Sequence, residues 1–330
     1  MKAAMKATIK TVANCIVFVV ASAMVPGAYA QPAQAWPVKS VRVIVPFAPG
    51  GGSDLTARPV AQKLSEALGQ QFIVDNRGGA GGAIGMELTA KAPPDGYTVM
   101  SISGSFSATS ATHKLGYDPF DALIPVVELG FVTNVLLVHP ALPAKSTREL
   151  IALARARPDT LVFASTGVGG VTHLSTALFL NMAGIRMIHV PYKSTGAVMP
   201  ELIAGQTQVL LGGLLGSLPF FSTGRLRALG VTSAKRWPTL PDLPPVAETV
   251  PGYETGTYYG LFFPKGTPQA IQARLNTETN KVLQDASIVN LLQTQGLVLS
   301  GGTAAVFARR VKKEYDDWVT VVRESKLKIE

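Results

Sequence analysis

The chain has 330 residues, enough for one large domain or two of ordinary size, and 47% of them are hydrophobic, which is ample for a buried core. The formal net charge is +9, but the basic residues are scattered with no run of five. A surface that binds along a nucleic-acid strand normally has clustered basic residues with aromatic residues between them. The scattered basic residues of this chain therefore argue against nucleic-acid binding.

The first thirty residues have the layout of a secretory signal peptide. Three lysines precede an apolar stretch, and Ala28-Tyr29-Ala30 supplies the small-x-small pattern that a signal peptidase accepts. The alternative is a membrane anchor, but the apolar run is short and Pro26 interrupts it. We therefore expect residues 1–30 to be removed and the mature protein to act in the periplasm. The only cysteine, Cys15, would leave with this segment, so no disulfide is expected.

The first half of the mature chain predicts alternating strands and helices. A buried strand over 41–47 ends at a glycine cluster, and a helix follows that Gly69 terminates. Pro59 is tolerated only near a first turn, which predicts that this helix starts later than Ser53. Further strands are predicted at 72–74 and 97–100, so the pattern indicates βαβ units.

The same layout returns after residue 140. A capping box at Ser146 to Glu149 opens a helix, and strands are predicted at 161–164, 189–192 and 209–211. Strand, glycine turn and helix thus occur twice, which indicates two similar α/β lobes. Apolar extended segments at 134–138 and 258–263 are placed where the chain would cross between the lobes, and helices at 268–285 and 303–323 close the chain.

Known catalytic motifs are missing from the sequence. It contains no nucleotide P-loop, no dinucleotide fingerprint, no G-x-S-x-G and no H-E-x-x-H, and its four histidines show no metal-ligand spacing. We expect no cofactor, no metal and no enzymatic activity.

Two strand–glycine–helix turns remain, at 46–54 and 165–173. Each presents backbone N–H groups at a helix start, where the helix dipole favours an anion, and glycine lets a ligand approach the backbone. Such turns in corresponding places of two lobes predict an anion held between them. Asp54 either complements the helix dipole or orients a water or ligand donor. His173 either donates to the ligand or packs within its lobe.

The turns and several other motifs resemble those of the TctC/Bug receptors, the extracytoplasmic solute-binding proteins of tripartite tricarboxylate transporters. The resemblance runs from about Trp36 to the C-terminal helix, and it is carried by 45–58, 74–82, 94–98, 117–119 and 190–193. It implies an α/β, type II periplasmic-binding-protein fold with two hinge strands and a ligand cleft between the lobes. The implied lobes are 36–137 plus 259–330, and 138–258.

In the family, two βα turns hold one ligand carboxylate through backbone amides, hydroxyls and waters. Carried onto matching positions, the first turn comprises Phe47, Ala48, Gly50, Gly51, Gly52, Ser53 and Asp54. The second comprises Ser165, Thr166, Gly167, Gly170 and His173, with Tyr192 nearby. The rest of the ligand is expected at less regular positions, among them Ser103, Ser105, Thr133 and Gly213.

The resemblance implies a monomeric receptor that delivers a small organic carboxylate to membrane permease subunits. Two other interpretations stay open: a sensory subunit that docks on a membrane kinase, and an enzyme on the same scaffold that would use Asp54 with His173. The scarcity of Arg and Lys in the candidate loops favours a mono- or dicarboxylate.

Overall fold

A computed structural model describes residues 36–324, so the predicted signal peptide lies outside the described residues. Residues 39–324 lie within one compact unit, to which the following description is confined. Within the described range, no helix combines the length and apolarity that crossing a bilayer requires.

Ten strands are described in the following order: β1 Val41–Val45, β2 Phe72–Asn76, β3 Thr98–Ser103, β4 Leu123–Val138, β5 Val162–Ser165, β6 Ile188–Pro191, β7 Val209–Gly213, β8 Arg227–Val231, β9 Gly256–Pro264 and β10 Val298–Leu299. The first-lobe helices are α2 Gly52–Leu68, α3 Ala83–Ala90, α4 Ser105–Thr112, α5 Pro119–Ala122, α10 Gln269–Val282, α11 Ala286–Thr294 and α12 Ala304–Glu324. The second-lobe helices are α6 Thr147–Ala156, α7 Val171–Ala183, α8 Thr195–Ile203 and α9 Leu214–Phe221.

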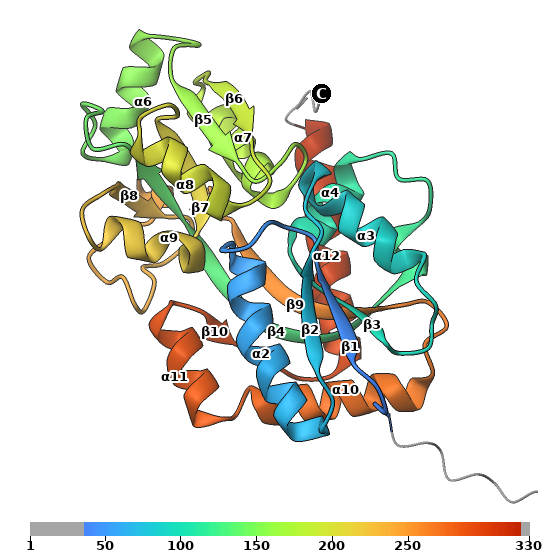
Figure 1. Cartoon of the computed structure of the whole chain (residues 1–330). Helices are drawn as coiled ribbons and strands as arrows, with labels where there is room; N and C mark the ends of the chain where they lie inside the picture. Colours follow the sequence, from blue (N-terminus) through green and yellow to red (C-terminus); the bar gives the residue numbers. More distant parts are fainter. Residues whose placement is uncertain (1–35, 325–330) are drawn as a thin grey trace, which may run out of the picture. The chain divides into compact units, whose positions relative to one another are not determined.

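The first lobe is built on the order β2-β1-β3-β9-β4, and the first three of these strands are parallel (Figure 1). β9 runs antiparallel to both β3 and β4. Strand β1 has a nearly continuous apolar sequence because the sheet is covered on both faces, and Val41, Ile44 and Val45 are fully buried. Helix α12, from the end of the chain, packs against α4 and β4.

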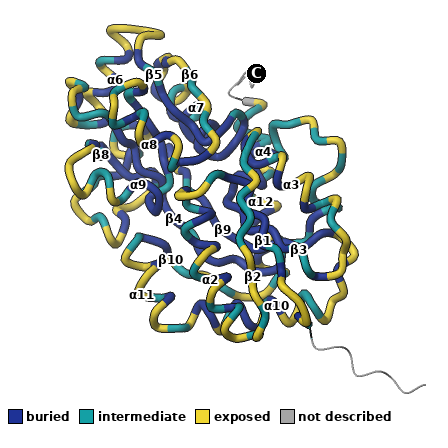
Figure 2. The backbone as a smooth tube through the Cα atoms, viewed as in Figure 1, coloured by how far each residue is buried: buried dark blue, intermediate teal, exposed yellow. Residues whose placement is uncertain are grey.

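The second lobe repeats the plan with β4-β7-β5-β6, in which β5 is parallel to both β6 and β7. Its core includes Leu136, Phe163, Phe179 and Tyr253. In Figure 2 the buried strands run through the interior of both lobes, and the exposed backbone lies on the outer helices and loops. The predicted α/β fold of two lobes is confirmed.

Strand β4 connects the two lobes. Leu123 to Thr133 pair with β9 in the first lobe, whereas Asn134 to Val138 pair with β7 in the second. The second crossing precedes β9, where the Thr255 N–H donates to the Thr232 carbonyl at 3.0 Å. Both crossings lie beside the cavity described below.

The predicted late start of the first helix is wrong, because α2 begins at Gly52 and contains Pro59 in its interior. Proline there removes one backbone hydrogen bond and costs roughly 3 kcal/mol in an isolated helix. Burial of Ala57, Val60 and Leu64 against the sheet outweighs that cost. Ser146 caps α6 as predicted, since the Glu149 N–H donates to Ser146 Oγ at 3.2 Å. The reciprocal bond of the capping box is displaced by one residue, because the Glu149 carboxylate accepts the N–H of Lys145 at 2.7 Å.

Candidate functional site

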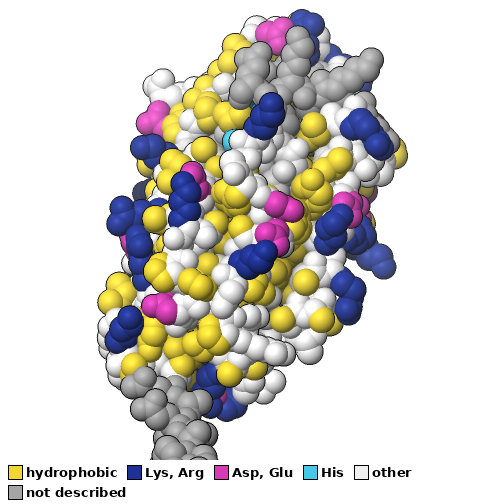
Figure 3. Space-filling model, turned by 90° about the vertical axis from the view of Figure 1, so that its right-hand side faces the viewer, with side chains coloured by type: hydrophobic (Ala, Val, Ile, Leu, Met, Phe, Trp, Pro, Cys, Tyr) yellow, Lys and Arg dark blue, Asp and Glu magenta, His cyan; other side chains and the backbone are white. Residues whose placement is uncertain are grey.

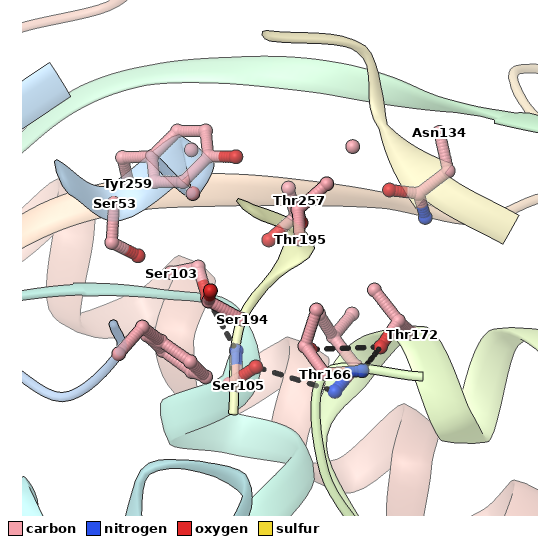
Figure 4. A pocket seen from close by; sticks show the side chains of 15 residues that line it. Ser53, Ser103, Ser105, Asn134, Thr166, Thr172, Ser194, Thr195, Thr257 and Tyr259 are labelled. Carbon is pink, nitrogen blue, oxygen red and sulfur yellow. Dashed lines mark hydrogen bonds between the residues drawn. The ribbon is translucent and has the colours of Figure 1, made fainter. Parts of the chain in front are cut away.

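A small cavity lies between the two lobes, lined by fifteen residues of which none carries a charged side chain (Figure 4). Its volume is about 40 Å³, enough for about three waters. The lining is made of Phe47, Gly51, Gly52, Ser53, Ser103, Ser105, Asn134, Thr166, Val171, Thr172, Ser194, Thr195, Gly213, Thr257 and Tyr259.

Five helices begin at this cavity. Their first residues, or the residues just before them, line it: α2, α4, α7, α8 and α9. The first N–H groups of a helix have no partner within it, and the helix dipole adds roughly half a positive charge at that end. The helix dipoles therefore contribute a positive potential at the cavity, although no cationic side chain lines it. Such an environment suits an anion.

The first turn is held by Asp54 from behind. One carboxylate oxygen, Oδ2, accepts the Gly50 N–H at 3.0 Å, and the other accepts from Asn76 Nδ2 at 2.9 Å. Arg58 pairs with the same carboxylate at 2.8 Å. Burial would raise the pKa of Asp54, but these hydrogen bonds and the Arg58 charge together lower it below its ordinary value. Asp54 thus supports the turn and does not line the cavity.

The second turn is supported by a stack of histidines. His173 Nδ1 accepts the Gly169 N–H at 3.0 Å, and His189 Nε2 lies 2.7 Å from Ser165 Oγ. Burial lowers the pKa of each imidazole to about 4, and the neighbouring histidine charges add to this. Both rings are therefore neutral at physiological pH, and they support the turn, His173 through a backbone N–H and His189 through the Ser165 hydroxyl.

Eight of the residues predicted from the sequence lie together in the lining: Phe47, Gly51, Gly52, Ser53, Ser103, Ser105, Thr166 and Gly213. The others stand behind or beside it: Ala48, Gly50, Asp54, Thr133, Ser165, Gly167, Gly170, His173 and Tyr192. Several of these shape the turns. The Gly167 backbone, at φ +132°, passes so close to Gly81 that a side chain there would meet its backbone nitrogen at 2.7 Å.

Thr133 illustrates how the sequence-based prediction missed a lining residue by one position. Its hydroxyl accepts the N–H groups of Thr232 and Ser233 at 3.2 and 3.0 Å, within the crossing between the lobes. Successive side chains of a strand point to opposite faces. The next residue, Asn134, consequently faces the cavity.

Other lining residues were not predicted, among them Ser194, Thr195, Thr257 and Tyr259. A signal was available for the first pair, because a strand and a small-residue turn precede α8 as they precede α2 and α7. Thr257 and Tyr259 lie two apart on β9 and share a face. Tyr259 is buried, and this raises the pKa of its hydroxyl well above the ordinary range, so that group is neutral.

Hydrogen bonds join the two lobes around the cavity. The Ala48 N–H donates to the Lys193 carbonyl at 3.3 Å, and the Val171 N–H donates to Ser105 Oγ at 3.3 Å. Thr112 Oγ1 donates to the Gly169 carbonyl at 3.2 Å. The two lobes are therefore in direct contact around the cavity.

The sequence is similar to a family described as the tripartite tricarboxylate transporter family receptor (TctC), whose profile matches residues 56–327. A Pseudomonas sp. (strain P51) protein, encoded between tcbD and tcbE, is 36% identical over 301 residues, which is 90% of each chain. Protein BugT of Bordetella pertussis is 34% identical over 301 residues, covering 90% of this chain and 92% of BugT.

Solved structures give the same result. The R. palustris protein Rpa4515, solved with adipate, superposes with a TM-score of 0.85 at 37% identity, covering 88% of this chain and 98% of that one. MatC from Rhodopseudomonas palustris, solved with bound malate, superposes with a TM-score of 0.84 at 30% identity, covering 87% of this chain and all of that one (100%). The chain therefore belongs to the family of TctC/Bug receptors of tripartite tricarboxylate transporters, which are periplasmic solute-binding proteins.

Proposed function

We propose that this receptor binds a small organic carboxylate in the cavity between its lobes and delivers it to the permease subunits of a tripartite transporter. The observation that carries the proposal is the convergence of five helix N-termini on a cavity lined by no charged side chain. A carboxylate would receive N–H donors from several helices at once. The adipate and malate in the related structures support the same ligand class.

The contacts of the carboxylate follow from the two turns. Gly52 and Ser53 at the start of α2, and Thr172 at the start of α7, contribute first-turn N–H groups. Thr166 Oγ1 lies 2.8 Å from Thr172 Oγ1, so one hydroxyl of this pair can donate onward to the ligand. The residues behind the turns, among them Asp54 and His173, would act by holding the backbone in place.

Capture would proceed by closure of the lobes. The cavity is small and inter-lobe hydrogen bonds lie beside it, so further closure of the lobes around a ligand would remove bulk water from it. Exclusion of water strengthens the hydrogen bonds between the N–H donors and a carboxylate. The lobe boundaries that we propose are 36–137 plus 259–330, and 138–258. The strand paired with β4 changes from β9 to β7 between Thr133 and Asn134. This change favours a first crossing there, a few residues before the proposed boundary at 137/138.

We also propose export to the periplasm with removal of residues 1–30, and a monomeric receptor that docks on its permease in the loaded form. On the face shown in Figure 3, the Lys and Arg side chains lie in several separate places among acidic and apolar ones. That distribution does not favour nucleic acid as a partner.

The enzyme alternative required Asp54 and His173 to act on a ligand. The Asp54 carboxylate is already bonded to Arg58, Asn76 and the Gly50 N–H, and His173 Nδ1 already accepts the Gly169 N–H.

The test begins with the full chain expressed in a bacterium and purified from the periplasm. The intact mass should correspond to a chain that begins at Gln31. A thermal-shift screen against mono-, di- and tricarboxylates and acidic amino acids should give at least one stabilising ligand, because a ligand that binds only the folded state raises the melting temperature. Calorimetry then gives the dissociation constant of each hit.

Two variants test the site itself. Thr166→Val removes a lining hydroxyl and should weaken binding about tenfold or more, in keeping with a lost hydrogen bond to a charged group. Thr294→Val is the matched control, since that threonine lies on the exposed face of α11. If no carboxylate stabilises the protein, even after partial unfolding and refolding to release any retained solute, the proposed function is wrong.

A further inference from the structure

Asn134 is a buried amide without a protein partner that faces the cavity. The residue is fully buried, and neither its Nδ2 nor its Oδ1 makes a hydrogen bond to any described residue. Figure 4 shows its side chain at one edge of the lining, on the opposite side of the view from Ser53. Because both amide atoms lack partners, the observation holds for either orientation of the amide.

The space in front of Asn134 is kept open by a glycine. A side-chain carbon at Gly213 would stand 3.3 Å from Tyr259 Oη and 3.9 Å from Asn134 Oδ1, so it would occupy the gap between these two groups. Gly213 has a φ of −59°, which any residue adopts, so the backbone alone does not require glycine there. The missing side chain therefore leaves room for a ligand group between Asn134 and Tyr259.

We infer that Asn134 determines the specificity of the receptor by pairing with a second polar group of the ligand that both donates and accepts hydrogen bonds. The ligand class is then a small carboxylate that also carries a hydroxyl or a primary carboxamide, as opposed to a plain dicarboxylate. This inference rests on the proposed function, because the first carboxylate is assigned there to the two turns.

The reason lies in the chemistry of the amide. Asparagine offers two N–H donors and a carbonyl acceptor, whereas an ionised carboxylate only accepts. A second carboxylate would satisfy Nδ2 but leave Oδ1 buried and unpaired beside negative oxygens. A hydroxyl or a carboxamide can satisfy both amide atoms. The nearby hydroxyl of Tyr259 is neutral and adds a further donor and acceptor at this end.

Calorimetry on the periplasmically purified protein tests this with ligands of equal length. The probes are succinate, its monoamide succinamate and 4-hydroxybutyrate, together with glutarate and glutaramate. The wild type should bind the monoamide or hydroxy acid at least about tenfold more tightly than the dicarboxylate, because the dicarboxylate leaves a buried acceptor unpaired. Asn134→Leu should abolish this preference. Gly213→Ala should weaken the binding of every probe, because its side chain fills the gap between Asn134 and Tyr259. Asn290→Leu, at an exposed position on α11, is the control.

A second readout separates specificity from a purely structural role. Removing an amide that makes no hydrogen bond should leave the melting temperature of the unliganded protein unchanged or raise it. Three results would each overturn this inference and leave the proposed function standing. They are a lower melting temperature for Asn134→Leu, a wild-type preference for the dicarboxylates, and a preference that survives in Asn134→Leu. If no carboxylate binds at all, the proposed function fails and this inference fails with it.

Discussion

The imidazole rings of His173 and His189 are stacked with their centroids 4.0 Å apart and an angle of 6° between their planes. Phe163 continues the stack, with its ring 4.7 Å from that of His189. These rings lie behind the second turn, in contact with Ser165 and Gly169. The stack joins the core of the second lobe to the turn that lies behind the cavity lining.

The stack predicts that the protein loses stability in mild acid. In the folded protein the pKa of each ring is about 4, below its unfolded value of 6.5, because burial disfavours the charged form. The unfolded chain therefore binds more protons as the pH falls from 6.5 to 4, and the free energy of unfolding decreases over that window. The loss near pH 5 should be up to about 2 kcal/mol for His173 and less for His189, which is only partly buried. Urea denaturation at pH 7 and pH 5 measures it. His189→Gln should reduce the difference between the two pH values, and an equal difference in this variant would contradict the assignment.

The Asp54 network predicts an effect on binding from a residue outside the cavity lining. Asp54→Asn keeps the shape of the side chain but weakens its pairing with Arg58, so the free energy of unfolding should fall by about 2 kcal/mol. This loss is smaller than for a fully buried ion pair because Arg58 is half-exposed. Carboxylate affinity should fall as the first turn loosens. Asp121→Asn is the control, because its pair with Lys265 is exposed and should contribute less than about 1 kcal/mol. Equal effects of the two substitutions would refute the supporting role of Asp54.

Gly52 predicts a steric effect at the start of α2. A side-chain carbon there would lie 2.7 Å from Cζ of Tyr259, an atom of a rigid ring that is itself buried. Gly52→Ala should therefore displace Tyr259 and destabilise the protein by about 1–3 kcal/mol, with a loss of carboxylate affinity. Gly116→Ala, where the added carbon meets nothing within 4 Å, should change stability by less than about 0.5 kcal/mol. Thermal denaturation and calorimetry on both variants would test the difference, and a stable, fully binding Gly52→Ala would argue against a fixed Tyr259.

The sequence predicted the parts of the fold that depend on local patterns. Apolar runs identified β1, β5 and β7, and the capping box identified the start of α6. Glycine clusters after strands located the two turns. The start of α2 was predicted wrongly because the penalty of Pro59 is local, whereas the burial that outweighs it depends on the packed sheet.

The cavity lining was only partly predictable for a similar reason. Residues such as Asn134, Thr195 and Tyr259 come from β4, α8 and β9, which are distant in sequence and meet only through the crossing of the two lobes. Which face of β4 points to the cavity depends on its register, and a change of one residue exchanges Thr133 for Asn134. No local pattern in the sequence fixes that register.

Gly196 predicts how closure of the lobes limits affinity. It lies in α8 of the second lobe, and a side-chain carbon there would stand 2.7 Å from the carbonyl oxygen of Pro49 in the first. Its φ lies outside the left-handed region, so Gly196→Ala should fold normally yet hinder the approach of the two lobes. The binding-competent closed form would then be less populated, and the apparent dissociation constant should rise in inverse proportion, by about tenfold or more. Small-angle scattering should show the wild type contracting with a saturating carboxylate and Gly196→Ala contracting less. Ala197→Ser, at the exposed neighbouring position, should behave as the wild type. Full contraction with unchanged affinity in Gly196→Ala would mean that the lobes do not close on the ligand at this contact.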